Sequence, residues 1–407
     1  MNKLTTWILH EGKKQGSVAK LFDAFVGQLR ELHIPILRAN LSLPTLHPQV
    51  AVVTYKWRHK DLADPPLRGP HHHRAFLHTF SEGNVEESSF IHGIHKSHLH
   101  TNSPFYQLGL GEKYIHENFQ EKQTEFTYPV FQDLYKLGAT GYLAMPVSFS
   151  NGQFSPSSWA TNKPGGFTPE DIIMLREAII ALEMLLETYM HQYKMQSLLE
   201  LYLGKQTGNL VLNGSILRGD LQSIQSVIWY SDLRSFTALS TKLSSPELVK
   251  TLNEYFFFVS ESIEKEKGEI LKFIGDAILA IFPLEKDTTA SVCQRALLAA
   301  KQANKELQQY NKISKDSKTP LQHGIALHVG EVQYGNIGGE NRLDFTVIGK
   351  AVNLAARIEG LCGKNQKEIL VSEEFQSYFE SGFTELGRFE LKGFQTTKAV
   401  YFPNTYS

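Results

Sequence analysis

Two aspartates follow apolar segments that have the composition of β-strands. Asp232 comes after QSVIWYS, and Asp276 lies in the turn of KFIGDAILAIF. If the two strand ends are neighbours, the carboxylates can bind hard divalent cations through oxygen. A single aspartate at such a place is usually a turn or capping residue, so the metal interpretation depends on the other residues of this region.

An asparagine and an arginine have the spacing of one helical face. Asn353 and Arg357 are four residues apart in GKAVNLAARIEGL, which puts both on one side of a helix. An amide beside a guanidinium suits a phosphoryl transition state, in which negative charge spreads over the non-bridging oxygens. For this pair alone, a solvated polar face would be the ordinary explanation.

Any phosphate chemistry here would depend on metal ions and positioned side chains. The sequence has no GK[ST] phosphate loop, because the similar string IGKA lacks the upstream glycine and the hydroxyl. It also has no nucleophile elbow and no zinc-protease motif. The segment LRSFT after Asp232 would turn into a helix whose free N–H groups can contact phosphates.

Strands alternate with helices from residue 224 onward. The strand QSVIWYSDL precedes the helix SSPELVKTLNEYFFFVSESIEKEKG, two strands around Gly275 and a helix over 288–310. The strand HGIALHVGEV, the helix GKAVNLAARIEGL and three further strands follow. This pattern predicts an α/β domain at 224–407, ferredoxin-like with additional elements.

A long helix is predicted at 168–204. Thr168 can cap its first N–H groups, Pro169 suits its first turn, and apolar residues recur at three- and four-residue steps as far as Tyr202. The near-heptad spacing favours a parallel coiled coil between two chains, and a helix packed on its own domain is the alternative. Three glycines in GNLVLNGSILRGD indicate a turn-rich connector at 205–223.

The first 167 residues are expected to form an α+β domain. GYLAMPVSF is typical of a strand, NGQ of a turn and SPSSWAT of a returning strand. Nine of the 16 histidines lie between His71 and His116. They include His71, His72, His73, His92, His95, His98 and His100. Imidazole is a common metal and haem ligand, but these histidines lack cysteine partners, so we prefer a polar, loop-rich surface.

Four strings resemble the class III nucleotidyl cyclase domain in their order and spacing. They are WYSDLRSFT, LKFIGDAILAIF, FTVIGKAVNLAARIE and FELKGF, and the resemblance covers residues 224–407. It implies that Asp232, Asp276 and Leu233 hold two Mg²⁺ or Mn²⁺ ions per active site. It also implies that Asn353 orients the ribose and that Arg357 stabilises the transition state.

The resemblance further implies that the substrate is ATP. Lys272 and Thr346 occupy the positions that recognise the base, and this pair resembles that of bacterial-type adenylyl cyclases. A lysine donor and a hydroxyl suit the adenine edge, whereas guanylyl cyclases carry Glu and Cys or a similar pair. Further substrate contacts are implied for Lys392, Arg342, Phe236 and Thr237.

In this family each site lies between two chains, so we expect a homodimer through the cyclase domain and the helix. Asp232 and Asp276 would come from one protomer, and the base, ribose and transition-state residues from the other. Two positions depart from the family pattern. Ser235 and Ala277 stand where the family usually has Gly, or Gly and other small residues, respectively.

Three other functions fit the sequence less well. A guanylyl cyclase is disfavoured by Lys272 and Thr346, and a catalytically silent cyclase-like module should lack one of the metal or transition-state residues. A diguanylate cyclase would need a GGDEF-type hairpin, which this sequence does not contain.

The strings DLYKLGATGYLAMPV and SWATNKPGGFTPEDIIML resemble the end of a GAF-like sensor domain that leads into a signalling helix. Such a domain would bind an unknown small molecule or cofactor and bias how the cyclase halves close.

The composition bounds the partners and the compartment. A net charge of −1 argues against nucleic acid and anionic membrane surfaces as partners. Only two cysteines occur, which fits a reducing cytoplasm. The N-terminal apolar run is too short for a secretory signal, and the segment DIIMLREAIIALEMLLETYM carries five charges in twenty residues. We therefore expect a cytoplasmic protein without a membrane span.

Overall fold

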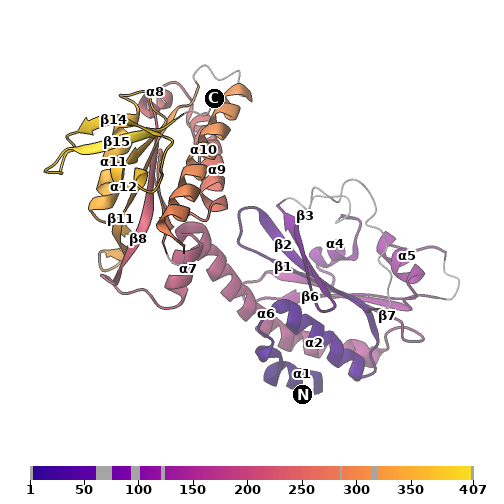
Figure 1. Ribbon diagram of the computed structural model, residues 1–407. Coiled ribbons are helices and arrows are strands. Elements are labelled where there is room, and N and C mark those ends of the chain that lie inside the picture. Colours follow the sequence, from indigo (N-terminus) through magenta and orange to yellow (C-terminus); the bar gives the residue numbers. More distant parts are fainter. Residues whose placement is uncertain are drawn as a thin grey trace. The chain divides into compact units, whose positions relative to one another are not determined.

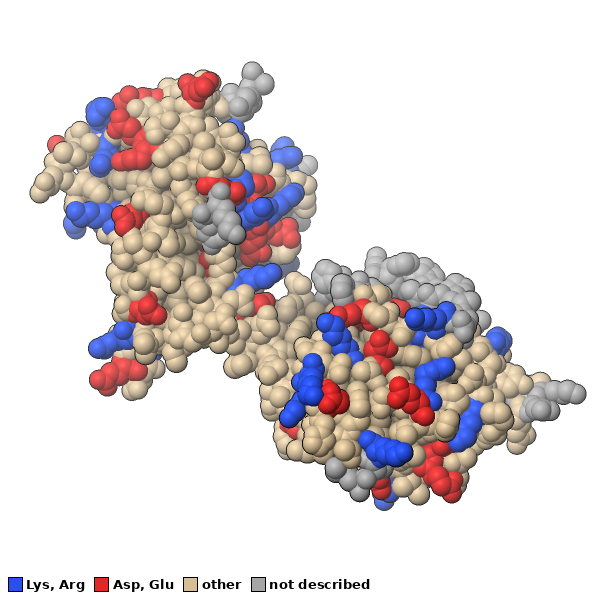
Figure 2. Space-filling view, turned by 60° about the horizontal axis from the view of Figure 1, so that its bottom comes forward, with Lys and Arg blue, Asp and Glu red and all other residues tan. Residues whose placement is uncertain are grey.

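Residues 3–60, 76–92, 101–120, 124–284, 287–313 and 320–404 are described by the computed structural model, with the backbone alone at 76–80. The chain divides into two compact units, Met1–Leu198 and Leu199–Ser407, and each is described by itself (Figure 1). In the described part of the chain, none of the helices has an apolar stretch long enough to cross a bilayer. Acidic and basic side chains are interspersed on the surface shown in Figure 2.

Unit 1 is built on an antiparallel sheet. Its strands are β1 (Ile36–Pro44), β2 (Val50–Arg58), β3 (Phe76–Glu82), β4 (Val85–Ile91), β5 (Ile115–Asn118), β6 (Gly141–Ser148) and β7 (Phe154–Thr161). Their order across the sheet is β3-β4-β2-β1-β7-β6-β5. The hairpin predicted from GYLAMPVSF and SPSSWAT forms as β6 and β7, with Pro146 opposite Pro156.

The helices of unit 1 cover both faces of this sheet. They are α1 (Lys3–His10), α2 (Val18–Glu31), α4 (Pro104–Gly109), α5 (Pro129–Lys136) and α6 (Pro169–Leu203), with a 3₁₀ turn at Gly12–Lys14. On one face, Leu41 and Trp159 belong to the core that includes α1, α2 and the first part of α6. On the other face, Tyr142 packs with residues of α4 and α5 (Figure 1). The sheet with its separate helical covers is an α+β arrangement.

Helix α6 forms where the sequence predicts a long helix. Over its first five turns, Leu175, Leu182 and Leu186 are buried in the core of unit 1. A second side of the same segment is apolar and open, since Ile180 is 58% and Met184 69% exposed. The first part of α6 therefore packs on its own domain, and it also carries an apolar surface that nothing in unit 1 covers.

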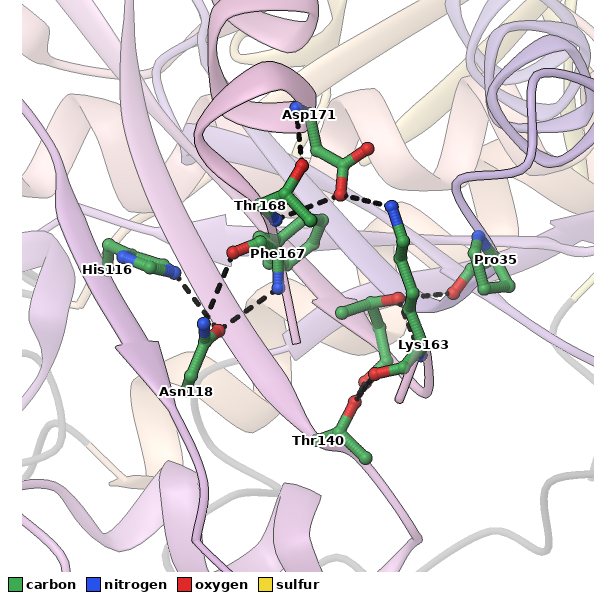
Figure 3. A network of polar contacts seen from close by, with 9 residues as sticks. Pro35, His116, Asn118, Thr140, Lys163, Phe167, Thr168 and Asp171 are labelled. Atoms are coloured by element: carbon green, nitrogen blue, oxygen red, sulfur yellow. Dashed lines mark hydrogen bonds and ion pairs between the residues drawn. The ribbon is translucent and has the colours of Figure 1, made fainter. Parts of the chain in front are cut away.

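Polar contacts anchor the start of α6 to the sheet (Figure 3). The Asp171 carboxylate accepts a hydrogen bond from the Thr168 backbone N–H at 2.9 Å. It also forms an ion pair with the Lys163 ammonium at 2.6 Å. Asn118 of β5 donates to the Phe167 carbonyl and accepts from the Phe167 N–H. Because both atoms of the Asn118 amide are used, the chain enters the helix at one fixed place on the sheet edge.

Unit 2 contains a larger sheet. Its strands are β8 (Leu221–Leu233), β9 (Glu269–Ile274), β10 (Ala277–Pro283), β11 (His323–Gly338), β12 (Leu343–Ile348), β13 (Ile369–Ser372), β14 (Phe383–Phe389) and β15 (Lys398–Pro403). The order is β14-β15-β13-β11-β8-β10-β9, with β12 paired to β11. The central order β11-β8-β10-β9, with helical connections after β8 and after β10, is ferredoxin-like, as the sequence predicts.

The helices of unit 2 pack on both faces of its sheet. They are α7 (Lys205–Leu212), α8 (Phe236–Ser240), α9 (Ser245–Lys265), α10 (Thr289–Ile313), α11 (Lys350–Cys362) and α12 (Glu373–Gln376). Helices α9 and α10 share one core with β8, β10 and β11, in which Trp229 is fully buried. On the opposite face, Ile228 packs with residues of α7, α11 and β12.

The prediction of a turn-rich connector at 205–223 is partly wrong, because the first part of this segment is helix α7 and β8 begins at Leu221. Leu210 and Val211 pack against the core of unit 2. A Cβ on Gly208 would lie 3.0 Å from the backbone of Leu199, so this glycine permits close helix packing rather than a turn. The Thr207 N–H and hydroxyl both donate to buried Glu269.

Candidate active site

Asp232 and Asp276 lie side by side. Asp232 is the next-to-last residue of β8, and Asp276 follows Gly275, whose φ of 66° forms the tight turn between β9 and β10. The pairing of Ser231 with Ile278 brings this turn next to the end of β8. Burial raises the pKa of Asp232 to about 7, and a hydrogen bond to Asp276 and its negative charge add to the rise.

This pair fits a divalent cation. The Oδ1 atom of Asp232 is buried and has no hydrogen-bond partner among the described residues. A buried carboxyl group whose pKa is raised beside a second carboxylate is poorly stabilised without a cation and well stabilised with one. Within the described residues no cluster of three or more His, Cys, Asp or Glu side chains is placed to hold a metal. The chain would therefore offer a cation two carboxylates and backbone oxygen.

A third carboxylate, which the sequence analysis missed, faces the same place. Glu359 lies on α11, and burial raises its pKa to about 7. The charge of Asp232 raises this pKa further, Arg234 lowers it and Asp276 raises it. Nothing in the spacing of Glu359 indicates this role, because it depends on how α11 packs against the end of β8.

A polar cavity of about 840 Å³ opens beside Asp232. Arg234, His323 and Glu359 line it, together with Asn304 of α10 and other polar residues. His323 is 1% exposed, and neither ring nitrogen has a partner among the described residues. Burial, with a contribution from Arg234, lowers the pKa of His323 to about 3. The cavity is thus lined by a buried imidazole whose neutral form is favoured.

Asn353 and Arg357 are exposed and share one side of α11. Glu359, two residues beyond Arg357, is rotated by about 200° around the helix axis. Glu359 lies close enough to Asp232 and Asp276 for their charges to act on it. Arg357 leaves the helix on nearly the opposite side, and Asn353, about 120° around the axis from Glu359, lies toward the same exposed side as Arg357. The predicted helical face therefore forms, but it does not point toward the aspartates of its own chain.

Lys272 and Thr346 come from two strands that are not paired in the sheet but contact each other. Lys272 of β9 forms an ion pair with Asp344 of β12. Asp344 and Thr346 lie on one side of β12, while Phe345 and Val347 on its other side are buried. The structure thus brings Lys272 to the side of β12 that carries Thr346. Asp344 is a further residue of this group that the sequence analysis did not identify.

The remaining predicted substrate residues lie around the domain. Phe236 is half-buried against the core that contains α9 and α10, and Thr237 is exposed in α8. Arg342 is exposed just before β12, and Lys392 is exposed in the turn between β14 and β15. Leu233, the last residue of β8, is 5% exposed, so only its backbone can contact an ion.

Ser235 and Ala277, the two positions that depart from the family pattern, differ in backbone strain. Ser235 has a φ of 58°, in the left-handed region that favours glycine, and directly precedes α8. Ala277 is 3% exposed and starts β10 without such strain.

Most of the histidine-rich segment, including His71, His72, His73, His95, His98 and His100, lies outside the described residues. Of the described members, His92 bonds the His47 carbonyl through Nε2 at 2.9 Å. His116 bonds the Asn118 side chain at 3.0 Å.

The sequence of unit 2 matches known proteins. Residues 221–404 match the model of the adenylate and guanylate cyclase catalytic domain. An adenylate cyclase of Anabaena cylindrica is 36% identical over 38% of this chain and 31% of the relative. A terminal-differentiation specific adenylate cyclase of Dictyostelium discoideum is 34% identical over 39% of this chain and 7% of the relative.

The chain thus spans less than a third of the length of these two relatives. A solved structure of a bacterial light-regulated adenylyl cyclase aligns with a TM-score of 0.48 at 23% identity. The alignment covers 64% of this chain and 86% of that one. The family match coincides with the paired aspartates at the end of β8 and with the ferredoxin-like order of the central strands. Residues 221–404 are therefore similar to the catalytic domain of adenylate and guanylate cyclases.

Proposed function

We propose that the protein is an adenylyl cyclase that converts ATP to 3′,5′-cyclic AMP and pyrophosphate. The observation that carries this proposal is the Asp232–Asp276 pair, with its unpartnered buried oxygen, inside a domain of this family. The two curated relatives named above are called adenylate cyclases. Because the family model covers both nucleotide classes, the choice of ATP rests on Lys272 and Thr346.

Asp232, Asp276 and the backbone of Leu233 would hold two Mg²⁺ or Mn²⁺ ions. Bound there, the ions would lower the pKa of the ribose 3′-hydroxyl and neutralise negative charge on the triphosphate. The two aspartates must be ionised to bind, and the orphaned Oδ1 of Asp232 is already oriented without a competing donor. Arg357 would stabilise charge on the α-phosphate, Asn353 would orient the ribose, and Lys392 and Arg342 would bind the triphosphate.

We further propose that the active site lies between two chains of a homodimer. The direction of Arg357 supports this, because the residue leaves α11 on the side opposite to Glu359 and the aspartates. The metal residues of one protomer would then meet Asn353, Arg357, Lys272 and Thr346 of the other. The open apolar side of α6, with Ile180 and Met184, supports a second helix there as a coiled coil.

Unit 1 is proposed to be a GAF-like sensor domain that regulates the cyclase through α6. A central antiparallel sheet with helices on both faces, leading directly into α6, supports this role. A cytoplasmic location belongs to the same proposal, because Cys293 and Cys362 are both buried free thiols.

Product analysis tests the proposed reaction. The purified chain is incubated with ATP or GTP and Mg²⁺ or Mn²⁺, and the nucleotides are separated. Cyclic AMP from ATP, and its loss in Asp276→Asn, is the expected result. Cyclic GMP as the main product would favour a guanylyl cyclase, and no cyclic nucleotide under any condition would favour a silent signalling module.

A further inference from the structure

An ion pair in unit 2 joins two strands that are not partners in the sheet. Strand β9 pairs with β10, and β12 pairs with β11. Where β9 and β12 contact each other, the Lys272 ammonium forms an ion pair with the Asp344 carboxylate. Among the described residues, neither side chain has another ion pair or hydrogen bond. The Asp344 carboxylate is therefore the group that sets where this ammonium lies.

This ion pair adds little to the stability of the fold. The side chains of Lys272 and Asp344 are 37% and 49% exposed, and an exposed ion pair gains little more than it loses through side-chain entropy and screening. Strand β12 is already held by its ladder with β11 and by the burial of Phe345 and Val347. The main effect of Asp344 is thus on the position of the lysine side chain.

The held ammonium lies on the side of β12 that carries Thr346. Asp344 and Thr346 are two residues apart, on the side of the strand that faces away from the core. Alternate residues of a strand point to the same side and lie about 7 Å apart. A base that contacts Thr346 would therefore find the Lys272 donor already in place beside it.

A lysine that is held differs from a free lysine in what it can select. Its long, flexible stem can bring three N–H donors to many places. One donor bound to Asp344 leaves two for a ligand, restricts them to one region and reduces the side-chain ordering that binding costs. The N1 atom of adenine is an acceptor, whereas N1 of guanine carries a hydrogen and the neighbouring acceptor is O6. A restricted donor can match only one of these patterns, while a mobile donor can move between them.

We propose that Asp344 is a positioning residue that holds the Lys272 ammonium for adenine and so contributes to the choice of ATP over GTP. The inference rests on the proposed function, because it deepens the assignment of Lys272 and Thr346 to the base. Asp344 acts through Lys272 and need not touch the nucleotide. Its removal should therefore matter only while Lys272 is present.

Nucleotide binding to the full chain, in a double-mutant cycle, provides the test. The probes are 3′-deoxy-ATP and 3′-deoxy-GTP with Mg²⁺, because neither has the 3′-hydroxyl that cyclisation needs. Calorimetry measures both dissociation constants in wild type, Asp344→Asn, Lys272→Met and the double variant. Asp287→Asn is the matched control, since the Asp287 side chain is 51% exposed and pairs with Arg295 at 2.7 Å in the same unit.

The wild type should bind the ATP analogue more tightly than the GTP analogue. Asp344→Asn should reduce this selectivity roughly two- to tenfold, because the base must then order the lysine side chain, and Asp287→Asn should leave it unchanged. In the Lys272→Met background, Asp344→Asn should have no further effect. Unchanged thermal unfolding of Asp344→Asn without nucleotide would show that the variant is folded.

The inference is overturned if Asp344→Asn leaves the selectivity intact. An equal loss with and without Lys272 would also overturn it, because Asp344 would then contact the base directly. So would a wild type that binds neither analogue or prefers the GTP analogue. Failure of the proposed function has a different signature: the chain makes no cyclic AMP from ATP, while the binding cycle still reports on Asp344.

Discussion

Glu359 and Arg357 leave helix α11 in opposite directions, although they are only two residues apart. Glu359 faces the carboxylates of Asp232 and Asp276, whose charges raise its pKa. Arg357 is exposed on the other side with Asn353. If Arg357 acts on the nucleotide held by Asp232, the nucleotide must lie against a second chain. A site shared between two chains can therefore be tested by mixing two inactive variants.

Asp276→Asn and Arg357→Ala should each be inactive alone and should restore activity when mixed. After random exchange, half of the dimers are heterodimers with one intact site each, so about a quarter of wild-type activity should return. The measurement is cyclic AMP production after co-refolding or co-expression. The pair Asp232→Asn and Asp276→Asn is the control, because both changes affect the same half-site. Equal recovery in both mixtures, or none in verified heterodimers, would contradict a site built from two chains.

The Lys272–Thr346 group should set nucleotide choice. Replacing Lys272 by Glu and Thr346 by Cys should lower the ratio of kcat/KM for ATP to that for GTP roughly ten- to hundredfold, because the adenine edge loses its donor. Steady-state kinetics with both nucleotides measures the ratio. Lys364→Glu, an exposed charge reversal on the same domain, should leave it unchanged. An unaltered ratio in the double variant would remove both residues from base recognition.

Asp232→Asn should stabilise the metal-free protein and abolish its response to Mg²⁺. The raised folded pKa of Asp232, about 7, means that the unfolded chain ionises first as pH rises from about 4. Folding stability is therefore lost between about pH 4 and 7, and the variant avoids that loss. In wild type at pH 8, Mg²⁺ at a hundred times its Kd should raise the free energy of unfolding by about 2.7 kcal/mol.

Thermal unfolding with and without Mg²⁺ measures both effects, and Asp220→Asn is the matched exposed control. The metal assignment fails if Mg²⁺ stabilises Asp232→Asn as much as it stabilises wild type.

Ser235→Gly should stabilise unit 2 by about 1 kcal/mol, because a left-handed conformation strains any residue with a Cβ. The φ of Ser235 is 58°. Denaturant unfolding measures the change in the free energy of unfolding. The same substitution at Ser240, in the last position of α8, should instead destabilise by up to about 0.5 kcal/mol. Equal effects at the two positions would argue against strain at Ser235.

His323 should make unit 2 sensitive to acid. Its folded pKa of about 3 lies below the value of about 6.5 in an unfolded chain. The contribution of neutral His323 to folding stability is fully present above pH 6.5 and is lost as the pH falls toward 3. At pH 5 the loss is about 2 kcal/mol.

His323→Phe should remove this part of the pH dependence of the free energy of unfolding between pH 7.5 and 5. His191→Phe, at an exposed position of α6, should not. If His323→Phe is as sensitive to acid as wild type, another group is responsible.

The sequence predicted what depends on local order along the chain. Asp232 and Asp276 end apolar strands, so their meeting follows once β8 and β10 pair. Glu359 and His323 could not be predicted, because their environment is created by the packing of α11 and β11 around a cavity. The helix α7 was missed because Gly208, which serves close packing against the end of α6, has the same appearance in sequence as a turn glycine.

The buried hydrogen bonds of Thr207 have a consequence for how a signal could travel. Thr207 holds Glu269, the first residue of β9, and Tyr334 of β11 joins the same contact at 2.8 Å from the Thr207 hydroxyl. Lys272 lies three residues further along β9. A twist of α6 that displaced α7 would therefore reorient the strand that carries Lys272, the residue proposed to select the base, and it would not need to disturb the aspartates. Regulation could then act as a change in substrate fit rather than as an on–off switch of the metal centre.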